Sequence, residues 1–506
     1  MTPTVETTVM AGPARRYVVL ATVSAATMLY AMAITIANVV LPQMRGALSA
    51  TPDQIAWVVT FNLVATAIVT PISGWLANRF GRRNVMLIGT FGFTVSSVLC
   101  GASGSLETVV LFRICQGAFG APLVPISQAI ILDTFPQRQH ALATALWGVG
   151  VVTGPIIGPT VGGYIAEEYS WRWVFFMMVP FGVITLACIW AFIQRRGERP
   201  RPVLDWIGFL ALAAALGAFQ LMFDRGQRNS WFESPETILE ATIGLLALYL
   251  FLVHIATARR PFFNPRLFLN HNYSLGLILA FLFGMLSFAP LVLFPPLLQD
   301  LRGFPDSTVG LLLATRGAGN MLSFLLVVRL AQWNPRLTLT LGFLCQVLSG
   351  WAISHFDINL TIFGIVWTSA LQGIGIGLIW VPLTLVMFST VRPDQLDEAS
   401  AVFHMLRNFA SSLFISICVA VVIRSTFINV AELSAVLTDF NKLLLFPWVT
   451  GGAGFESARE LASANAEVQR QAAMIGYLNA FRLFTIVSII PIPLIWLARM
   501  PKRDGA

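Results

Sequence analysis

The chain has 506 residues, of which 56% are hydrophobic and only 11% are charged. Soluble domains carry about 25% charged residues, so this composition excludes a water-soluble globule and equally a disordered chain. The formal net charge of +8 comes from basic residues scattered between apolar stretches, which argues against a nucleic-acid partner and favours a lipid bilayer as the surroundings.

The apolar stretches are long enough to cross a membrane. A hydrocarbon core about 30 Å thick needs roughly 20 apolar residues per helix. The first stretch runs on uninterrupted to Pro42, which favours a retained helix over a cleaved signal peptide. The sequence therefore predicts an all-α polytopic membrane protein with fourteen transmembrane helices, which begin near Tyr17, Gln54, Asn84, Thr108, Ala141, Trp171, Leu204, Thr237, Ser274, Thr308, Leu337, Thr361, Ala399 and Gly476.

The distribution of basic residues predicts the orientation. With the N-terminus inside, more than half of the 32 Lys and Arg fall in cytoplasmic loops and tails, as the positive-inside rule requires. Both termini are therefore expected in the cytoplasm. The segment 425–473 is expected to be a solvated external loop with a helix-like run from Ser457 to Met474, the alternative being a docking site for a partner.

An internal repeat relates the two ends of the chain. Gln116-Gly117 in the fourth expected span matches Gln372-Gly373 in the twelfth. A proline follows the glutamine after nine residues in the first case (Pro125) and after ten in the second (Pro382). Two six-helix halves separated by two inserted helices explain this match. The predicted organisation is a cytoplasmic tail, an N-terminal bundle, a linker with two helices, a C-terminal bundle and a second tail: 1–16, 17–193, 194–273, 274–498 and 499–506.

Two glycines and three arginines lie within ten residues after the second expected span, on an expected tight turn. Small residues let helices approach closely, and arginines can bind helix C-termini or a nearby carboxylate. We expect a gating loop that holds one conformation, although an ordinary positively charged loop is the alternative. Its residues are Gly74, Asn78, Arg79, Gly81 and Arg82, with Asp133 as the carboxylate.

Two further spans carry unusual residues. An arginine within a span costs about 2.5 to 3.5 kcal/mol on insertion scales, so Arg113 is expected to face a cavity or a partner. In the next span, glycines recur at every fourth position and two prolines free backbone carbonyls, which predicts a smooth, bendable helix face. Plain small-residue packing is the alternative for this set: Gly150, Gly154, Pro155, Gly158, Pro159, Gly162 and Gly163.

These three segments resemble, in order and spacing, the loop, buried-arginine and antiporter motifs of the major facilitator superfamily. With fourteen spans and Leu406-Arg407-Asn408 in the thirteenth, the chain is most similar to the drug/proton antiporter branch, the multidrug efflux transporters. The resemblance implies a major facilitator fold of 6+2+6 helices in two pseudo-symmetric halves. It also implies alternating access, a bacterial inner-membrane location and, in some members, a periplasmic adaptor and an outer-membrane channel.

The chain departs from the family pattern where proton coupling is concerned. The loop aspartate of the family falls at Asn78, and the acidic residue usual in the first helix falls at Ala33. The resemblance gives Arg113 a role in proton movement, but arginine does not titrate usefully. The titratable candidates are Asp224, Glu107, Asp133 and His404, each of which could equally be a wet helix end or a hydrogen-bonded packing residue.

A substrate site is expected near mid-membrane between the halves. Arg113, Arg316 and Arg407 would make it electropositive, so anionic or zwitterionic substrates are as plausible as the cationic drugs typical of the family. Trp57 is a further possible aromatic wall. The expected polar and aromatic contributors are Asn38, Asn62, Gln116, Gln128, Arg316, Asn320, Trp380, Arg407 and Asn408.

The leading hypothesis is a secondary transporter that exports amphipathic small molecules by alternating access, driven by protons. An uncoupled facilitator, or an exporter of an anionic metabolite, siderophore or lipid-like substrate, is the first alternative, and a non-transporting scaffold or sensor is the second. No nucleophile and base pair or metal-ligand cluster is recognisable in the sequence, so neither an enzyme nor a bound cofactor or metal is expected.

Overall fold

The computed structural model describes residues 13–194, 203–227, 229–259, 261–436 and 458–498. Within these ranges every regular element is helical. Twelve helical segments are each long and apolar enough to cross a membrane, and a bent pair makes a thirteenth. One further helix of 29 residues brings the total to the fourteen expected from the sequence. Most of both tails lies outside the described residues.

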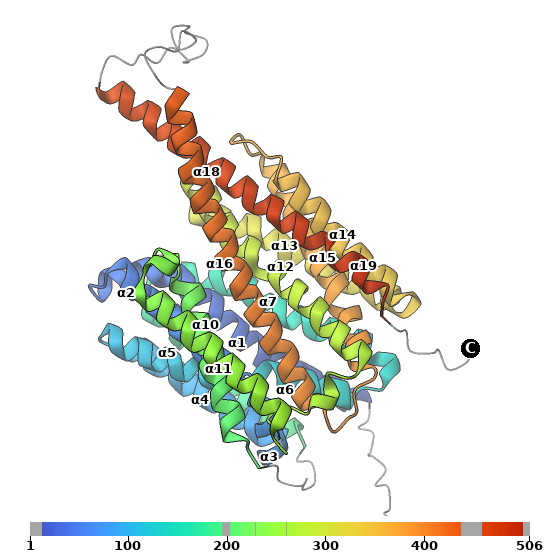
Figure 1. Cartoon of the computed structure of the whole chain (residues 1–506). Helices are drawn as coiled ribbons and strands as arrows, with labels where there is room; N and C mark the ends of the chain where they lie inside the picture. The colour runs from blue at the N-terminus through green and yellow to red at the C-terminus, as the bar shows by residue number, and fades with distance from the viewer. Residues whose placement is uncertain (1–12, 195–202, 228, 260, 437–457, 499–506) are drawn as a thin grey trace, which may run out of the picture.

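The helices fall into two bundles joined by a linker pair (Figure 1). The N-terminal half contains α1 (Pro13–Ala47), α2 (Pro52–Val69), α3 (Ser73–Phe80), α4 (Arg82–Ala102), α5 (Leu106–Gly120), α6 (Leu123–Thr134), α7 (His140–Glu168), α8 (Trp171–Phe176) and α9 (Met178–Phe192). The linker contains α10 (Trp206–Arg225) and α11 (Pro235–Thr257). The C-terminal half contains α12 (His271–Arg302), α13 (Asp306–Trp333), α14 (Pro335–Ile353), α15 (Ile362–Phe388), α16 (Leu396–Val436), α18 (Ala458–Ile489) and α19 (Pro491–Ile495). Short 3-10 turns lie at Gln137–Gln139, Trp231–Glu233 and Pro265–Leu267.

Several expected spans are broken into two helices at a proline. The second is split into α2 and α3, which are bent by 55°, with Pro71 between them. The fourth is split into α5 and α6, with Pro122 between them. Proline removes a backbone donor and its ring clashes with the preceding turn, so it ends or bends a helix. The bend at Pro71 turns α3 and the start of α4 back toward the other half.

The internal repeat seen in the sequence corresponds to a repeated packing contact. A Cβ on Gly117 of α5 would collide with the backbone carbonyl of Asn62 on α2. A Cβ on Gly373 of α15 would collide with the backbone carbonyl of Arg316 on α13. The two pairs therefore occupy corresponding positions in the two halves, so Arg316 stands in the C-terminal half where Asn62 stands in the N-terminal half.

The linker helix α10 lies against both halves. Its Gln220 donates to Ser412 of α16 at 2.8 Å, and Ser416 of α16 donates to the carbonyl of Phe223 at 2.8 Å. On its other side, Thr60 of α2 donates to the carboxylate of Asp224. The helix thus occupies the seam between α2 and α16.

The described parts of the expected external loop, 425–436 and 458–473, are helical, and residues 437–457 lie outside the described residues. The helix α16 continues to Val436, and α18 begins at Ala458, well before the span start expected near Gly476. The expected helix-like run is confirmed from Ala458 onward, and it is continuous with the last span. Figure 1 shows α16 and α18 side by side, projecting beyond the other helices at the end opposite α3. Helix periodicity carries on past the bilayer boundary, and hydropathy alone does not reveal that continuation.

Candidate functional site

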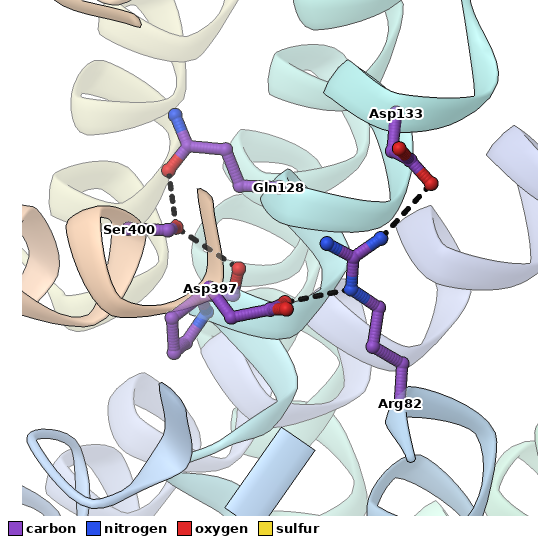
Figure 2. Close-up of polar contacts among 6 residues, drawn as sticks. Arg82, Gln128, Asp133, Asp397 and Ser400 are labelled. Atoms are coloured by element: carbon purple, nitrogen blue, oxygen red, sulfur yellow. Dashed lines mark hydrogen bonds and ion pairs between the residues drawn. The ribbon is translucent and has the colours of Figure 1, made fainter. Parts of the chain in front are cut away.

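The two halves meet at a buried ion pair centred on Arg82, the first residue of α4 (Figure 2). Its Nε donates to Oδ1 of Asp397 at 2.6 Å, and a terminal nitrogen donates to Oδ2 of Asp133 at 3.1 Å. The side chains of Arg82 and Asp397 are only 9% and 1% exposed. Charge-assisted hydrogen bonds of this kind are the strong ones, and burial shields them from salt.

The partners of Arg82 belong to different halves. Asp133 lies at the end of α6, in the same half as Arg82, whereas Asp397 lies in the first turn of α16 in the other half. A carboxylate there also interacts favourably with the α16 dipole. The ion pair between Arg82 and Asp397 therefore joins the two halves. We call this pair the latch, and this end of the molecule the Arg82 end.

The glycines of the predicted gating loop explain how α3 reaches α16. A Cβ on Gly74 would lie 2.9 Å from the Cα of Glu398, closer than real Cβ contacts. Gly81, between α3 and α4, has φ +82, a value that L side chains rarely adopt. Asn78 and Arg79 lie on the last turn of α3, both half-buried. The sequence predicted the Asp133 partner but missed Asp397, whose signal was an acid two residues before the span expected to begin near Ala399.

A second contact between the halves lies beside the first (Figure 2). Ser400 of α16 donates to the carbonyl of Pro125 at 2.9 Å and to Oε1 of Gln128 at 3.1 Å. Nε2 of His404 lies 2.6 Å from the same Gln128 oxygen. Because an amide oxygen only accepts, this geometry assigns the proton to Nε2 and leaves Nδ1 as an acceptor. His404 is only 1% exposed, and its Nδ1 has no hydrogen-bond partner within the described residues.

Aromatic rings from both halves surround His404. The ring of Trp147 on α7 lies 5.9 Å from Trp380 on α15 and 6.3 Å from His404, centroid to centroid. Phe403 packs edge-on against Trp380 at 5.6 Å, and Trp147 donates to Thr27 of α1 at 3.1 Å. Because His404 and Ser400 share the same Gln128 oxygen, these rings adjoin the polar contact between the halves.

Arg113 is 1% exposed and bound mainly by neutral oxygens. It donates to the carbonyl of Val58 at 3.1 Å, to the carbonyl of Ala33 at 3.4 Å and to the side chain of Gln116. The position where the family has an acidic residue therefore offers Arg113 only a backbone carbonyl. Asn62 donates to the carbonyl of Arg113 at 2.8 Å, so both predicted substrate contacts Asn62 and Gln116 are engaged in the interior of the N-terminal half.

The arginines of the C-terminal half are bound less completely. Arg316, 5% exposed, donates to the carbonyl of Ser287 on α12. Arg407 donates to Asn408 at 3.0 Å and lies over the ring of Trp380 at 5.0 Å. Buried atoms without a hydrogen-bond partner in the described part of the chain include Nε of Arg316, Nε of Arg407, Nε1 of Trp380 and Oδ1 of Asn320. Neither arginine has an ion pair there.

The glycine face of α7 packs against α1 in the same half. Cβ atoms on Gly150, Gly154 and Gly158 would lie 2.9, 2.6 and 3.0 Å from Ser24, Met28 and Met32, and one on Gly162 would collide with Ile36. Both partners step by four residues, so a ridge of α1 fits a groove of α7. The predicted face exists, and its partner is α1 rather than the opposite half. Pro155 and Gly163 are half-buried, and the side chain of Pro159 lies outside the described residues.

The remaining predicted residues lie elsewhere. Asp224 is at the contact between α10 and α2, bonded to Thr60, and Glu107 is in the first turn of α5. Trp57 is 39% exposed on α2. The side chain of Asn38 lies outside the described residues. The structure thus brings together Gln128, His404, Trp380, Arg407 and their neighbours, and it leaves Asp224 apart from them.

Comparison with known proteins agrees with this architecture. Residues 23–415 match the family model described as Major Facilitator Superfamily. The chain is 30% identical over 486 residues to the multidrug export protein EmrB of Escherichia coli K12, covering 95% of each chain. It is 30% identical over 474 residues to the fatty acid resistance protein FarB of Neisseria gonorrhoeae, covering 93% of this chain and 94% of FarB. A crystal structure of the human organic anion transporter MFSD10 has a TM-score of 0.59 at 15% identity, and the match covers 94% of this chain and 100% of MFSD10. At this identity, the match shows only that the two proteins share a fold.

Proposed function

Because this chain belongs to the Major Facilitator Superfamily, a family of transporters, we propose that it exports amphipathic small molecules across the bacterial inner membrane by proton-driven alternating access. The names of its multidrug and fatty-acid-resistance relatives support this direction of transport. The predicted division at 17–193, 194–273 and 274–498 supplies the two bundles that would rock and the linker between them. A periplasmic adaptor and an outer-membrane channel stay predictions.

The latch between Arg82 and Asp397 carries the proposal. A scaffold gains nothing from two layers of breakable polar contacts between otherwise separate bundles, whereas a carrier needs such contacts to close one end while the other is open. The positive-inside distribution favours a cytoplasmic location for the Arg82 end. On that orientation, the structure corresponds to the state whose cytoplasmic side is closed.

His404 is our proposed coupling group in place of the missing helix 1 acid. It lies between the halves, and the side chains facing it from α6, α7 and α15 are the neutral Gln128, Trp147 and Trp380. On its own helix the nearest charged group is Arg407, three residues on, and Asp397 is already bound to Arg82. A proton on Nδ1 would therefore put a second positive charge beside Arg407 in a water-poor contact.

The direction of this effect suits an exporter. The closed Arg82 end accommodates a neutral His404, so protonation favours the state in which that end is open and His404 is solvated. A proton taken up from outside would return the empty carrier to the inward-open state, and its loss to the cytoplasm would allow the latch to form again.

The test uses purified protein in liposomes, an amphipathic fluorescent dye and an imposed pH gradient. Wild-type protein and the control His355→Gln, an exposed histidine of the same half, should concentrate the dye against its gradient. His404→Gln keeps a hydrogen-bonding side chain but cannot titrate, so it should allow downhill flux without accumulation. Gradient-driven accumulation by His404→Gln would reject the coupling role.

The absence of an acid at Ala33 favours one rival, an uncoupled carrier. Dye flux by wild-type protein that ignores the imposed pH gradient would establish that rival and reject proton antiport. A sensor or scaffold would be favoured if Arg113→Ala and Gly154→Leu left the cellular resistance phenotype unchanged.

A further inference from the structure

In the C-terminal half, the charges of the buried Arg316 and the half-buried Arg407 are not balanced by a carboxylate within the described residues. From this we propose that the exported compounds are amphipathic anions, and that Arg316 and Arg407, with Trp380, hold their headgroup. The inference rests on the proposed export function and names its substrate class. The ligand chemistry is an oxyanion, such as a carboxylate, attached to an apolar body.

Arg316 is incompletely bound for a cation removed from water. It is 5% exposed, it donates to the carbonyl of Ser287, and its Nε has no hydrogen-bond partner within the described residues. Burying an unpaired charge costs several kcal/mol per ion unless other groups compensate. One carbonyl oxygen with no formal charge is little compensation, so an anion that binds here would gain a pre-oriented partner.

Arg407 on α16 shows the same deficit. Its guanidinium lies 5.0 Å from the ring centre of Trp380, and its nearest polar partner is the neutral Asn408. Its Nε and the indole Nε1 of Trp380 both lack acceptors in the described part of the chain. Stacking on an indole orients a guanidinium while leaving its edge free to donate to an oxyanion.

Both arginines are attached to one short stretch of α12. Arg316 bonds to the carbonyl of Ser287, and a Cβ on Gly284 would collide with the backbone carbonyl of Arg407. Positions 284 and 287 are three residues apart and therefore share a helix face. The side chain of Arg316, from α13, and the backbone of Arg407, on α16, therefore contact the same turn of α12.

The N-terminal half lacks this arrangement. Asn62, which corresponds to Arg316 in the repeat, is neutral and donates to the carbonyl of Arg113. Arg113 in turn reaches two carbonyls and the side chain of Gln116. One terminal nitrogen of Arg113 lacks a partner within the described residues, but its other donors are bound. Arg316 and Arg407, by contrast, each donate to a single neutral oxygen, so their half offers the headgroup more free donors at these positions.

The surroundings fit an apolar body attached to that headgroup. Trp380 contacts the rings of Phe283, Phe403 and Trp147 at 5.9, 5.6 and 5.9 Å. Binding pockets of this kind are mostly apolar, with a few convergent polar groups that set orientation. A doubly charged, fully polar anion would leave these rings without a partner, so the arrangement favours a single anionic group on an apolar molecule.

The experiment compares decanoate with decylamine and decanamide, which share one alkyl chain and differ in charge. Binding is measured by calorimetry on full-length protein in a neutral maltoside, below the micelle-forming concentration of each ligand. Arg316→Gln and Arg407→Gln are compared with Arg482→Gln, which removes an exposed arginine of the same half. The control variant also subtracts partitioning of ligand into the micelle.

We expect wild-type protein and Arg482→Gln to prefer decanoate by at least tenfold, and Arg316→Gln and Arg407→Gln each to lose that preference. Arg316→Lys and Arg407→Lys, which keep the charge, should retain part of it, which separates loss of the anion site from misfolding. Equal binding of all three ligands by wild-type protein, or an unchanged decanoate preference in both Gln variants, would overturn the inference.

An anionic phospholipid offers the same headgroup chemistry, so a second arm distinguishes the sources. Decanoate binding is repeated in nanodiscs of phosphatidylcholine and of phosphatidylglycerol. Undiminished binding in phosphatidylglycerol supports a free amphiphile as the ligand, whereas abolition there would reject it in favour of a resident lipid. Because these measurements need no flux, selective binding without transport would count against the export function and not against the anion site.

Discussion

Replacing Asp397 by Asn tests the latch between the halves. The change removes the charge that holds Arg82 across the interface at 2.6 Å while keeping the size of the side chain. Arg82 retains Asp133 at 3.1 Å in its own half, so the guanidinium stays paired and the loss falls on the contact between the halves. The closed state of the Arg82 end should therefore be weakened without unfolding the protein.

The expected magnitude follows from the burial of this pair. A hydrogen bond to a charged group contributes about 1.5 to 3 kcal/mol. Removing one member of a buried ion pair costs about 3 to 5 kcal/mol when the remaining charge is left without any partner. Because Asp133 remains, we take about 2 kcal/mol. At about 1.4 kcal/mol per factor of ten, the ratio of closed to open molecules should fall by about 30-fold.

The assay is electron–electron distance measurement between spin labels on the two halves at the Arg82 end. Labels at Gln137 and Pro393, both exposed, are introduced after the five native cysteines are replaced. Asp397→Asn should show a population with a longer distance. Asp394→Asn disrupts an exposed ion pair with Arg392 in the same region and should change little, since such pairs are weak. Identical distance distributions in Asp397→Asn and wild-type protein would refute the latch.

Three further predictions concern helix packing and the buried arginine. Gly154→Leu should abolish export in a dye-efflux assay and lower the melting temperature, because even a Cβ at this position would lie 2.6 Å from a backbone carbonyl of α1. The control Gly46→Ala should change neither export nor melting temperature, because a Cβ there has nothing within 4 Å. Gly377→Ala should destabilise the C-terminal half by about 1 to 3 kcal/mol in a denaturant titration, because its Cβ would collide with Ser323. Arg113→Ala should insert in the membrane at wild-type levels but lose transport by at least tenfold; full activity would contradict its assigned role.

Much of the fold was determined by local features of the sequence. Fourteen apolar stretches each became a helix or a helix pair, because a backbone in hydrocarbon can satisfy its hydrogen bonds in few other ways. The glycines of α7 form one face because their spacing of four matches the helix turn. The limits of α16 and α18 were misjudged, since an amphipathic helix that leaves the bilayer loses its hydropathy signal while remaining helical.

What the sequence could not determine is which residues meet across the two halves. Nothing local to Arg82 distinguishes Asp133, 51 positions away, from Asp397, 315 positions away, as its partner. In the same way, His404 and Gln128 are ordinary polar residues until the halves dock and bury them together. Such pairings depend on how two separate bundles pack against each other, and the energy of that packing is spread over many side chains that no short motif records.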